Sequence, residues 1–222
     1  MIDPKIEVAY QAALEAFSKY NSFDATVLTG DFGDVFLSDE DFLTKVDALD
    51  EVFDNNPQVE VLREVFFDLL MINFFSADVK KLEEDYLDTP EWEDIEEQTL
   101  DRGTELLNLL LYLNECEDED IEPELEDYLK EFLLVDEDEF QDEYRIYEPI
   151  IANQILMESP VEEIANIANS LPEDSELAEL FYPVMCFFQN VDPSPEAKAV
   201  IAEHALEAEF DMAVLEILVN FQ

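Results

Sequence analysis

The sequence predicts an all-α fold of about nine or ten antiparallel helices. Apolar residues recur at helical spacing along most of the 222-residue chain, and only 3 glycines are available for turns and bulges. Most of the 10 prolines stand where a helix would begin or end. We expect the helices to stack as a HEAT-like or irregular α-α superhelix. No sequence motif recurs at a fixed spacing, so the sequence does not predict an array of true structural repeats.

The first third of the chain should contain three helices and one irregular segment. Ile6, Tyr10, Ala13 and Phe17 share one helical face, which predicts a helix over 3–20. Residues 21–37 hold two of the glycines, so a short loop or hairpin is expected there. The remaining helices are expected from the capping residue Ser38 to about residue 53, and from Pro57 through 59–75, which is apolar nearly all round and therefore central.

Prolines mark most of the later helix starts. Thr89 should cap a helix that begins at Pro90, and Pro149 should kink or divide another because it lacks a backbone N–H. The expected helices of the middle third lie at 78–87, 90–115, from Pro123 through Leu133, and at 136–159. Those of the last third lie at 160–169, 173–190, 195–207 and 209–221.

The composition is that of a folded protein with an acidic surface. The chain has 59 acidic and 10 basic residues, a net charge of −49, yet 48 % of its residues are hydrophobic. Disordered chains combine high charge with few hydrophobic residues, so disorder is not predicted. We expect one acidic helical domain over residues 1–222, with 115–123 as the candidate boundary of any subdivision.

The acidic residues gather in the middle of the chain. Residues 82–148 contain 28 Asp and Glu residues against three basic ones. These acids avoid the apolar stripes of the expected helices, so they should lie on solvent-exposed helix faces. The candidate partner-binding residues are the acids of the densest runs: Glu115, Glu117, Asp118, Glu119, Asp120, Glu122, Glu124, Glu126, Asp127, Asp136, Glu137, Asp138, Glu139, Asp142 and Glu143.

The net charge exceeds what solubility requires, which is a magnitude of about 2–8. Like charges one helical turn apart cost about 0.2–0.5 kcal/mol per pair, so another requirement should maintain the excess. A chain of this size exposes about 10,000 Å², which gives one net charge per roughly 210 Å². Duplex DNA carries about one charge per 110 Å². The two densities match if the acids converge on one face.

No catalytic constellation is found in the sequence. The one histidine, His204, is expected to be structural, and no Ser-His-Asp or Cys-His arrangement can be built around it. No acidic run has EF-hand spacing, and no phosphate-binding loop is present. We therefore expect no enzymatic activity, no cofactor and no specific metal site. Direct nucleic-acid binding is not expected either, because 59 acids would repel the phosphates.

The location in the cell is predicted from three features. Cys116 and Cys186 form no CxxC motif or disulfide framework, and buried free thiols are typical of a reducing compartment. No apolar run approaches the roughly 18 residues of a membrane span. The first residues lack the basic and apolar regions of a signal peptide. These features predict a cytoplasmic protein that does not enter a membrane, and they leave its oligomeric state open.

Three functional hypotheses remain. The first is a DNA mimic that inhibits or regulates a nuclease, a restriction or other defence protein, or a DNA-binding protein by covering its basic surface. The second is an acidic immunity protein or chaperone-like protein dedicated to one basic partner, which would bind through a partly apolar patch with an acidic rim. An exposed aromatic side chain among Tyr86, Trp92, Tyr112 and Tyr147 would favour the second. The third is adaptation of the surface to high salt.

Overall fold

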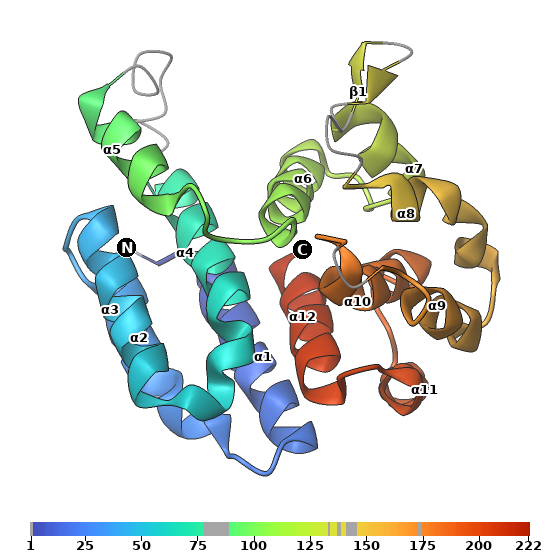
Figure 1. Ribbon diagram of the computed structural model, residues 1–222, viewed down its shortest axis with the longest axis horizontal. Coiled ribbons are helices and arrows are strands. Elements are labelled where there is room, and N and C mark those ends of the chain that lie inside the picture. The colour runs from blue at the N-terminus through green and yellow to red at the C-terminus, as the bar shows by residue number, and fades with distance from the viewer. Residues whose placement is uncertain (1, 78–88, 133, 137–138, 141–145, 173–174) are drawn as a thin grey trace.

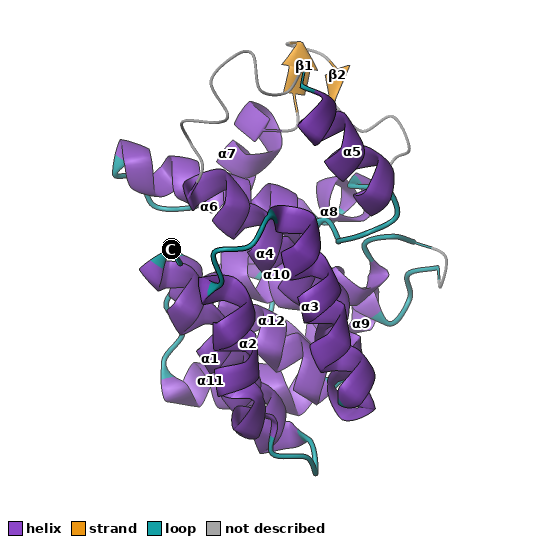
Figure 2. Ribbon diagram, turned by 90° about the vertical axis from the view of Figure 1, so that its left-hand side faces the viewer, coloured by secondary structure: helices purple, strands orange, loops and turns teal. Residues whose placement is uncertain are grey.

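Helices form nearly all the regular structure of the computed structural model, which describes residues 2–77, 89–132, 134–136, 139–140, 146–172 and 175–222 (Figures 1 and 2). Twelve α-helices occur in these residues, so the predicted all-α class is confirmed. The described strands are β1 (Leu134–Asp136) and β2 (Glu139–Phe140). They pair antiparallel as a short ribbon at one end of the molecule (Figure 2).

The helices follow one another with short connections. The first four are α1 (Pro4–Tyr20), α2 (Thr29–Leu37), α3 (Phe42–Asn55) and α4 (Arg63–Ala77), with 3₁₀ helices over Ala25–Leu28 and Pro57–Leu62. The middle of the chain forms α5 (Pro90–Thr99), α6 (Leu106–Glu119), α7 (Leu125–Asp127), a π-helical turn over Tyr128–Phe132 and α8 (Glu148–Ala152). The last third forms a 3₁₀ helix over Gln154–Glu158, then α9 (Val161–Ala168), α10 (Ala178–Gln189), α11 (Pro195–His204) and α12 (Ala208–Phe221).

Helices α1 and α12 pack extensively against each other and join the two ends of the chain (Figure 1). The Lys5 ammonium near the start of α1 lies 4.8 Å from the ring of Phe221 at the end of α12. At the opposite ends, the Asn21 amide lies 3.5 Å from the Glu209 carboxylate. The two helices are therefore antiparallel, and their apolar faces form the centre of the core.

Helix α4 is central, as its sequence predicts. Its residues from Val65 to Phe74 are all buried, and it packs against α1, α3 and α6. A helix with apolar residues on every side is stable in water only when neighbours cover it. The two buried polar residues of this run, Asp68 and Asn73, are both hydrogen-bonded, Asn73 through its Oδ1 to the backbone N–H of Asp3.

The loop or hairpin expected over 21–37 is wrong for most of its length. Residues 25–28 form a 3₁₀ helix, and α2 contains both Gly30 and Gly33. Gly33 is required by the close packing of two helices, because a Cβ at this position would lie only 3.2 Å from the Tyr10 hydroxyl. The glycine therefore lets α2 approach α1, and it does not mark a turn.

Several expected helix boundaries also need correction. The helix expected from Ser38 begins at Phe42, because the Asp41 carboxylate accepts the Thr44 N–H and caps it. The helix expected over 90–115 is broken between α5 and α6 by Gly103, whose φ is +83°. Where the structure describes 136–159, the expected helix is replaced by the end of β1, by β2, by α8, which Pro149 opens, and by a 3₁₀ helix, while 137–138 and 141–145 lie outside the described residues. The helix expected from Pro123 is replaced by α7 and a π turn.

Other sequence predictions hold. Thr89 caps α5 by accepting the Trp92 N–H, with Pro90 at the first helical position. Both cysteines are free and buried. The helix expected over 78–87 lies outside the described residues, and the superhelical arrangement stays a prediction.

Candidate protein-interaction surface

The end of α6 carries the densest exposed group of acids in the described part of the chain. We call it the acidic ridge and define it as Glu115, Glu117, Asp118, Glu119, Asp120, Glu122, Glu124 and Glu126, all of which are exposed. Four of these acids fall in the last five residues of α6, 115–119. At the helical rise of about 1.5 Å per residue they supply one charge per about 2 Å of axis. Duplex DNA supplies one per about 1.7 Å.

The turn after α6 sets the direction of the ridge. The Ile121 N–H donates to the Cys116 carbonyl at 2.9 Å, and the Asp120 N–H donates to the Glu117 carbonyl at 3.2 Å. These bonds close a Schellman motif, whose left-handed position is usually glycine. Asp120 occupies that position with φ 58° and ψ 43°, and it is the one non-glycine residue with positive φ among the described residues. The fold therefore keeps a charged residue where glycine would be less strained.

Buried Tyr112 fixes the second half of the ridge. Its hydroxyl donates to the Glu124 carbonyl at 3.1 Å and accepts the Glu124 N–H at 3.0 Å. Tyr112 is 3 % exposed and stands on the inner face of α6. One side chain thus satisfies both backbone groups of a ridge residue, which holds the segment after the turn against α6.

Within the described part of the chain, most ridge carboxylates face solvent without a basic partner. Glu117 pairs with Lys5, and Glu126 pairs with Lys130 one helical turn away. For the other six, no ion pair is found among the described residues. The ridge therefore keeps most of its formal charge available to a binding partner.

The remaining sequence-predicted candidates divide into two groups. Asp127 is half-buried at the end of α7, so it contributes less to the exposed surface. Asp136 and Glu139 lie in β1 and β2, which places their backbones in the ribbon beyond α7. The side chains of these two, together with Glu137, Asp138, Asp142 and Glu143, lie outside the described part of the structure.

Helix α5 forms a second acidic surface, which the sequence analysis did not include among its candidates. Glu91, Glu93, Asp94, Glu96 and Glu97 are all exposed and fall within seven residues. They again supply one charge per about 2 Å of helix axis. These acids belong to the acid-rich segment 82–148, but they do not form one of its densest runs, from which the candidate residues were taken.

The charge is not confined to one face. Exposed acids also stand on other helices: Asp31, Asp34, Asp47, Glu51, Glu162 and Glu163. Averaged over the 11,996 Å² surface, the −49 charge gives one per about 245 Å², less than half the density on DNA. The acids therefore do not all lie on one face, as a match to the average charge density of DNA would require. A charge density like that of DNA occurs only locally in the described structure, on α5 and the acidic ridge.

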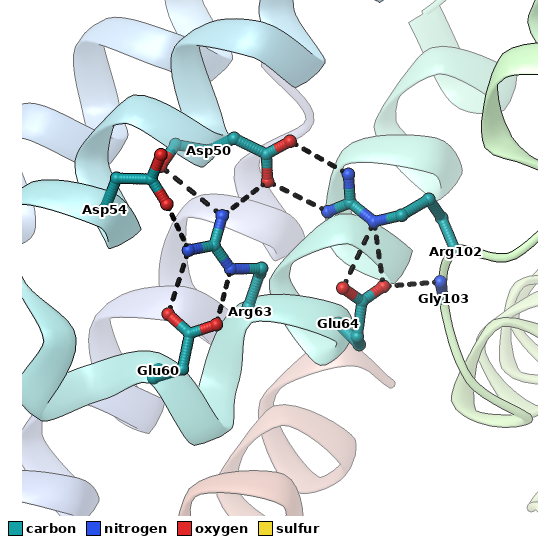
Figure 3. Close-up of polar contacts among 7 residues, drawn as sticks. All are labelled: Asp50, Asp54, Glu60, Arg63, Glu64, Arg102 and Gly103. Carbon is teal, nitrogen blue, oxygen red and sulfur yellow. Dashed lines mark hydrogen bonds and ion pairs between the residues drawn. The ribbon is translucent and has the colours of Figure 1, made fainter.

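Two arginines join α3, α4 and the α5–α6 loop, and so position α5 (Figure 3). Asp50 accepts hydrogen bonds from both Arg63, at 2.8 Å, and Arg102, at 3.0 and 3.1 Å. Arg102 also donates to Glu64, which accepts the Gly103 N–H at 2.7 Å. These guanidinium groups are thus used inside the fold, where they neutralise carboxylates that helix packing brings together.

Buried Asp68 holds the same loop from α4. Its carboxyl group is hydrogen-bonded to the Thr104 N–H at 3.0 Å and to the Thr104 hydroxyl at 2.5 Å. Burial raises the pKa of Asp68 to about 8, against its ordinary 3.8. Burial also raises the pKa of Asp211 to about 6, where the carboxylate accepts the Leu206 and Glu207 N–H groups before α12. Both buried carboxyl groups are therefore hydrogen-bonded to the backbone of a loop that they hold in place.

Surface hollows with apolar floors flank the acidic ridge. One, of about 370 Å³, lies beside the α6 turn and includes Leu113, Ile121 and Pro123. A second, of about 480 Å³, we call the ridge groove. We call the apolar part of its lining the floor and the exposed acids of its lining the rim. The floor is Leu125, Met157, Phe188 and Val191, and the rim is Glu122, Glu124, Glu126 and Asp192.

The aromatic residues named as indicators of a dedicated partner are not exposed where the structure describes them. Tyr112 and Tyr147 are 3 % and 4 % exposed, and Trp92 is half-buried against Phe75. Tyr86 lies outside the described residues. The ridge groove, which sequence reasoning did not predict, supplies instead the apolar patch with an acidic rim.

Within the described residues, no group of His, Cys, Asp and Glu side chains is arranged to hold a metal ion. His204 is half-buried at the last residue of α11. None of the described helices has the length and apolar character that crossing a membrane requires. Comparison of the chain with protein-family models, with curated proteins and with solved structures gave no match.

Proposed function

We propose that this protein is a nucleic-acid mimic, which inhibits or regulates a nuclease, a defence protein or a DNA-binding protein by occupying its basic surface. The observation that carries the proposal is the axial charge density of α5 and the acidic ridge. Helix α5 and the part of the ridge within α6 each present about one carboxylate per 2 Å of helix, close to the phosphate density of a duplex. A basic groove that accepts phosphates at that density can accept these carboxylates through the same lysines and arginines.

Rigidity of the charged elements supports the same conclusion. The Tyr112 hydroxyl fixes the acidic ridge, and the bonds from Arg102 and Asp68 fix the loop that follows α5. Charges held in place lose little conformational entropy when they bind. The partner should associate rapidly at low salt, because the opposite fields steer the encounter. On this proposal the protein acts by binding and performs no catalysis.

A dedicated basic partner that does not use a nucleic-acid site is the second candidate. The observation that favours it is the ridge groove, whose apolar floor has no counterpart in a phosphate backbone. Interfaces of this kind combine an apolar centre with a polar rim. The two candidates differ in which surface of the partner is covered.

Capture followed by competition distinguishes them. The protein is immobilised, a lysate is passed over it at low salt, and proteins eluting between about 0.1 and 0.5 M NaCl are challenged with duplex DNA. Mimicry predicts displacement by DNA, whereas a dedicated partner resists it. The variant with Glu115, Asp118 and Glu119 changed to their amides should retain less of the same protein. A control variant with Asp31, Asp47 and Glu51 changed to their amides loses equal charge on α2 and α3 and should retain it.

A further inference from the structure

We propose that the ridge groove binds one apolar side chain of a partner segment that is flanked by lysine or arginine residues. This inference shares one assumption with the proposed function, namely that the partner is a basic protein. It adds that recognition includes an apolar anchor, a feature that phosphate mimicry does not require. The anchor would give the protein preference among the many basic proteins that its charge alone attracts.

The walls of the groove are formed before any partner binds. On one side, the Tyr112 hydroxyl holds Glu124 in place through both of its backbone groups. On the other, the Gln189 amide at the end of α10 donates to the carbonyls of Leu156, at 3.1 Å, and Ser159, at 2.5 Å. These bonds tie the 3₁₀ helix that carries Met157 to α10. A preformed site binds with a smaller entropic cost than one that must be assembled.

The floor offers apolar surface that an isolated protein leaves partly in water. Leu125 and Phe188 form its deeper part, at 5 % and 9 % exposure, while Met157 and Val191 are only half-buried. Methionine suits such a position because its flexible thioether adapts to the shape of the side chain it meets. Covering this surface removes apolar area from water, which is the favourable term that an anchor residue supplies.

Charge restricts the occupant to a basic segment. Four carboxylates stand on the rim, and none of the described residues that line the groove is basic. Of the rim carboxylates, Glu126 pairs with Lys130, one helical turn away. A second copy of this chain would bring a net charge of −49, and nucleic acid or an anionic membrane would be repelled in the same way. A protein segment with cationic residues on both sides of an apolar one fits both the floor and the rim.

The test uses two short synthetic peptides of equal charge as probes. In one, a single leucine stands between lysine and arginine residues, and in the other that leucine is replaced by alanine. Binding to the full-length protein is followed by fluorescence anisotropy of a dye on the peptide. Burial of the leucine should make the first peptide bind about tenfold more tightly. The preference should persist at about 0.5 M NaCl, where the purely electrostatic part of binding is screened.

Matched variants locate the contact. Met157→Gln should remove most of the preference for leucine, because it makes the floor polar at similar length. Ile155→Gln is the control: Ile155 stands on the same 3₁₀ helix, is 70 % exposed and does not line the groove. Val191→Thr, nearly unchanged in shape, provides a second floor variant if Met157→Gln does not fold. Circular dichroism reports folding for each.

Equal affinity for the two peptides would overturn the inference, as would an equal loss of preference in Met157→Gln and Ile155→Gln. The peptides involve no nucleic-acid site. A partner that duplex DNA fails to displace would therefore contradict mimicry and leave the leucine preference unaffected. Loss of the leucine preference would likewise leave displacement by DNA unaffected.

Discussion

A single buried hydroxyl, that of Tyr112, is hydrogen-bonded to both the N–H and the carbonyl of Glu124, at 3.0 and 3.1 Å. The bond pair crosses from the inner face of α6 to the exposed segment after its turn. It couples the core of the protein to the position of the acidic ridge. The geometry of the charged surface is thus set by a buried residue.

Tyr112→Phe should lower the free energy of unfolding by about 1–3 kcal/mol, because two backbone groups lose their partner. Denaturant unfolding followed by circular dichroism measures the change. Tyr20→Phe is the control, since Tyr20 is half-buried at the end of α1 and no hydrogen bond of its hydroxyl is found among the described residues. Equal stability of Tyr112→Phe and the native protein would show that the bond pair does not hold the ridge.

Asp120→Gly should stabilise the fold and weaken partner binding. Glycine adopts the left-handed conformation of residue 120 without steric cost, so we expect a gain of up to about 1 kcal/mol. The same change removes one ridge charge. Asp118→Asn is the matched variant, because it removes a charge from the helical part of the ridge without changing the backbone. Thermal unfolding and retention by the captured partner give the two readouts. A loss of stability in Asp120→Gly would contradict the view that the aspartate is kept for its charge.

Two glycines should respond in opposite ways to alanine. At Gly103 a Cβ would lie 2.6 Å from Asp68 Oδ1 at φ +83°, so Gly103→Ala should destabilise by about 1–3 kcal/mol. At Gly30, an exposed position in the first turn of α2, a Cβ would meet nothing within 4 Å, and Gly30→Ala should stabilise by about 0.5–1 kcal/mol. Chemical denaturation of the two variants side by side tests the pair. Stabilisation of both variants would mean that the α5–α6 loop tolerates rearrangement, and destabilisation of both would mean that Gly30 is needed for its backbone conformation.

Stability should fall as the pH rises from about 4 to about 8. Burial raises the pKa of Asp68 from 3.8 to about 8, so in this window the folded protein binds more protons than the unfolded chain. Asp211, with its pKa raised to about 6, acts in the same direction over the lower part of the window. Unfolding free energies measured at several pH values, in about 0.5 M NaCl to screen the surface charges, should show the slope.

Asp68→Asn should reduce that slope. The amide oxygen can accept the Thr104 N–H and the amide nitrogen can donate to the Thr104 hydroxyl, so both contacts are kept without a titrating group. The variant should gain most stability relative to the native protein near pH 8. An unchanged slope would assign the pH dependence to other groups.

The sequence predicted the elements whose signals are local. The periodicity of Ile6, Tyr10, Ala13 and Phe17 located α1, and the Thr89–Pro90 pair located the start of α5. The apolar run of α4 predicted a central helix, because such a helix must be covered on all sides. Each of these signals depends on residues within a few turns of one another.

The elements that were predicted wrongly depend on distant residues. Gly33 looked like a turn, but it lies within α2 where the Tyr10 hydroxyl approaches it. The break between α5 and α6 follows from Gly103, whose loop is held by Glu64 and Asp68 on α4. The acidic ridge was predicted from its charge. The ridge groove was not, because Met157 and Phe188 come from segments far along the chain.

The most direct measurement of mimicry is whether the partner can bind this protein and DNA at once. A protein captured from the lysate and displaced by DNA is purified, and its affinity for a labelled duplex is measured at rising concentrations of this chain. Occupation of the nucleic-acid site predicts an apparent Kd for the duplex that rises in proportion to the added protein. The rise should be weaker with the Glu115, Asp118 and Glu119 amide variant. A ternary complex with an unchanged duplex Kd would contradict mimicry.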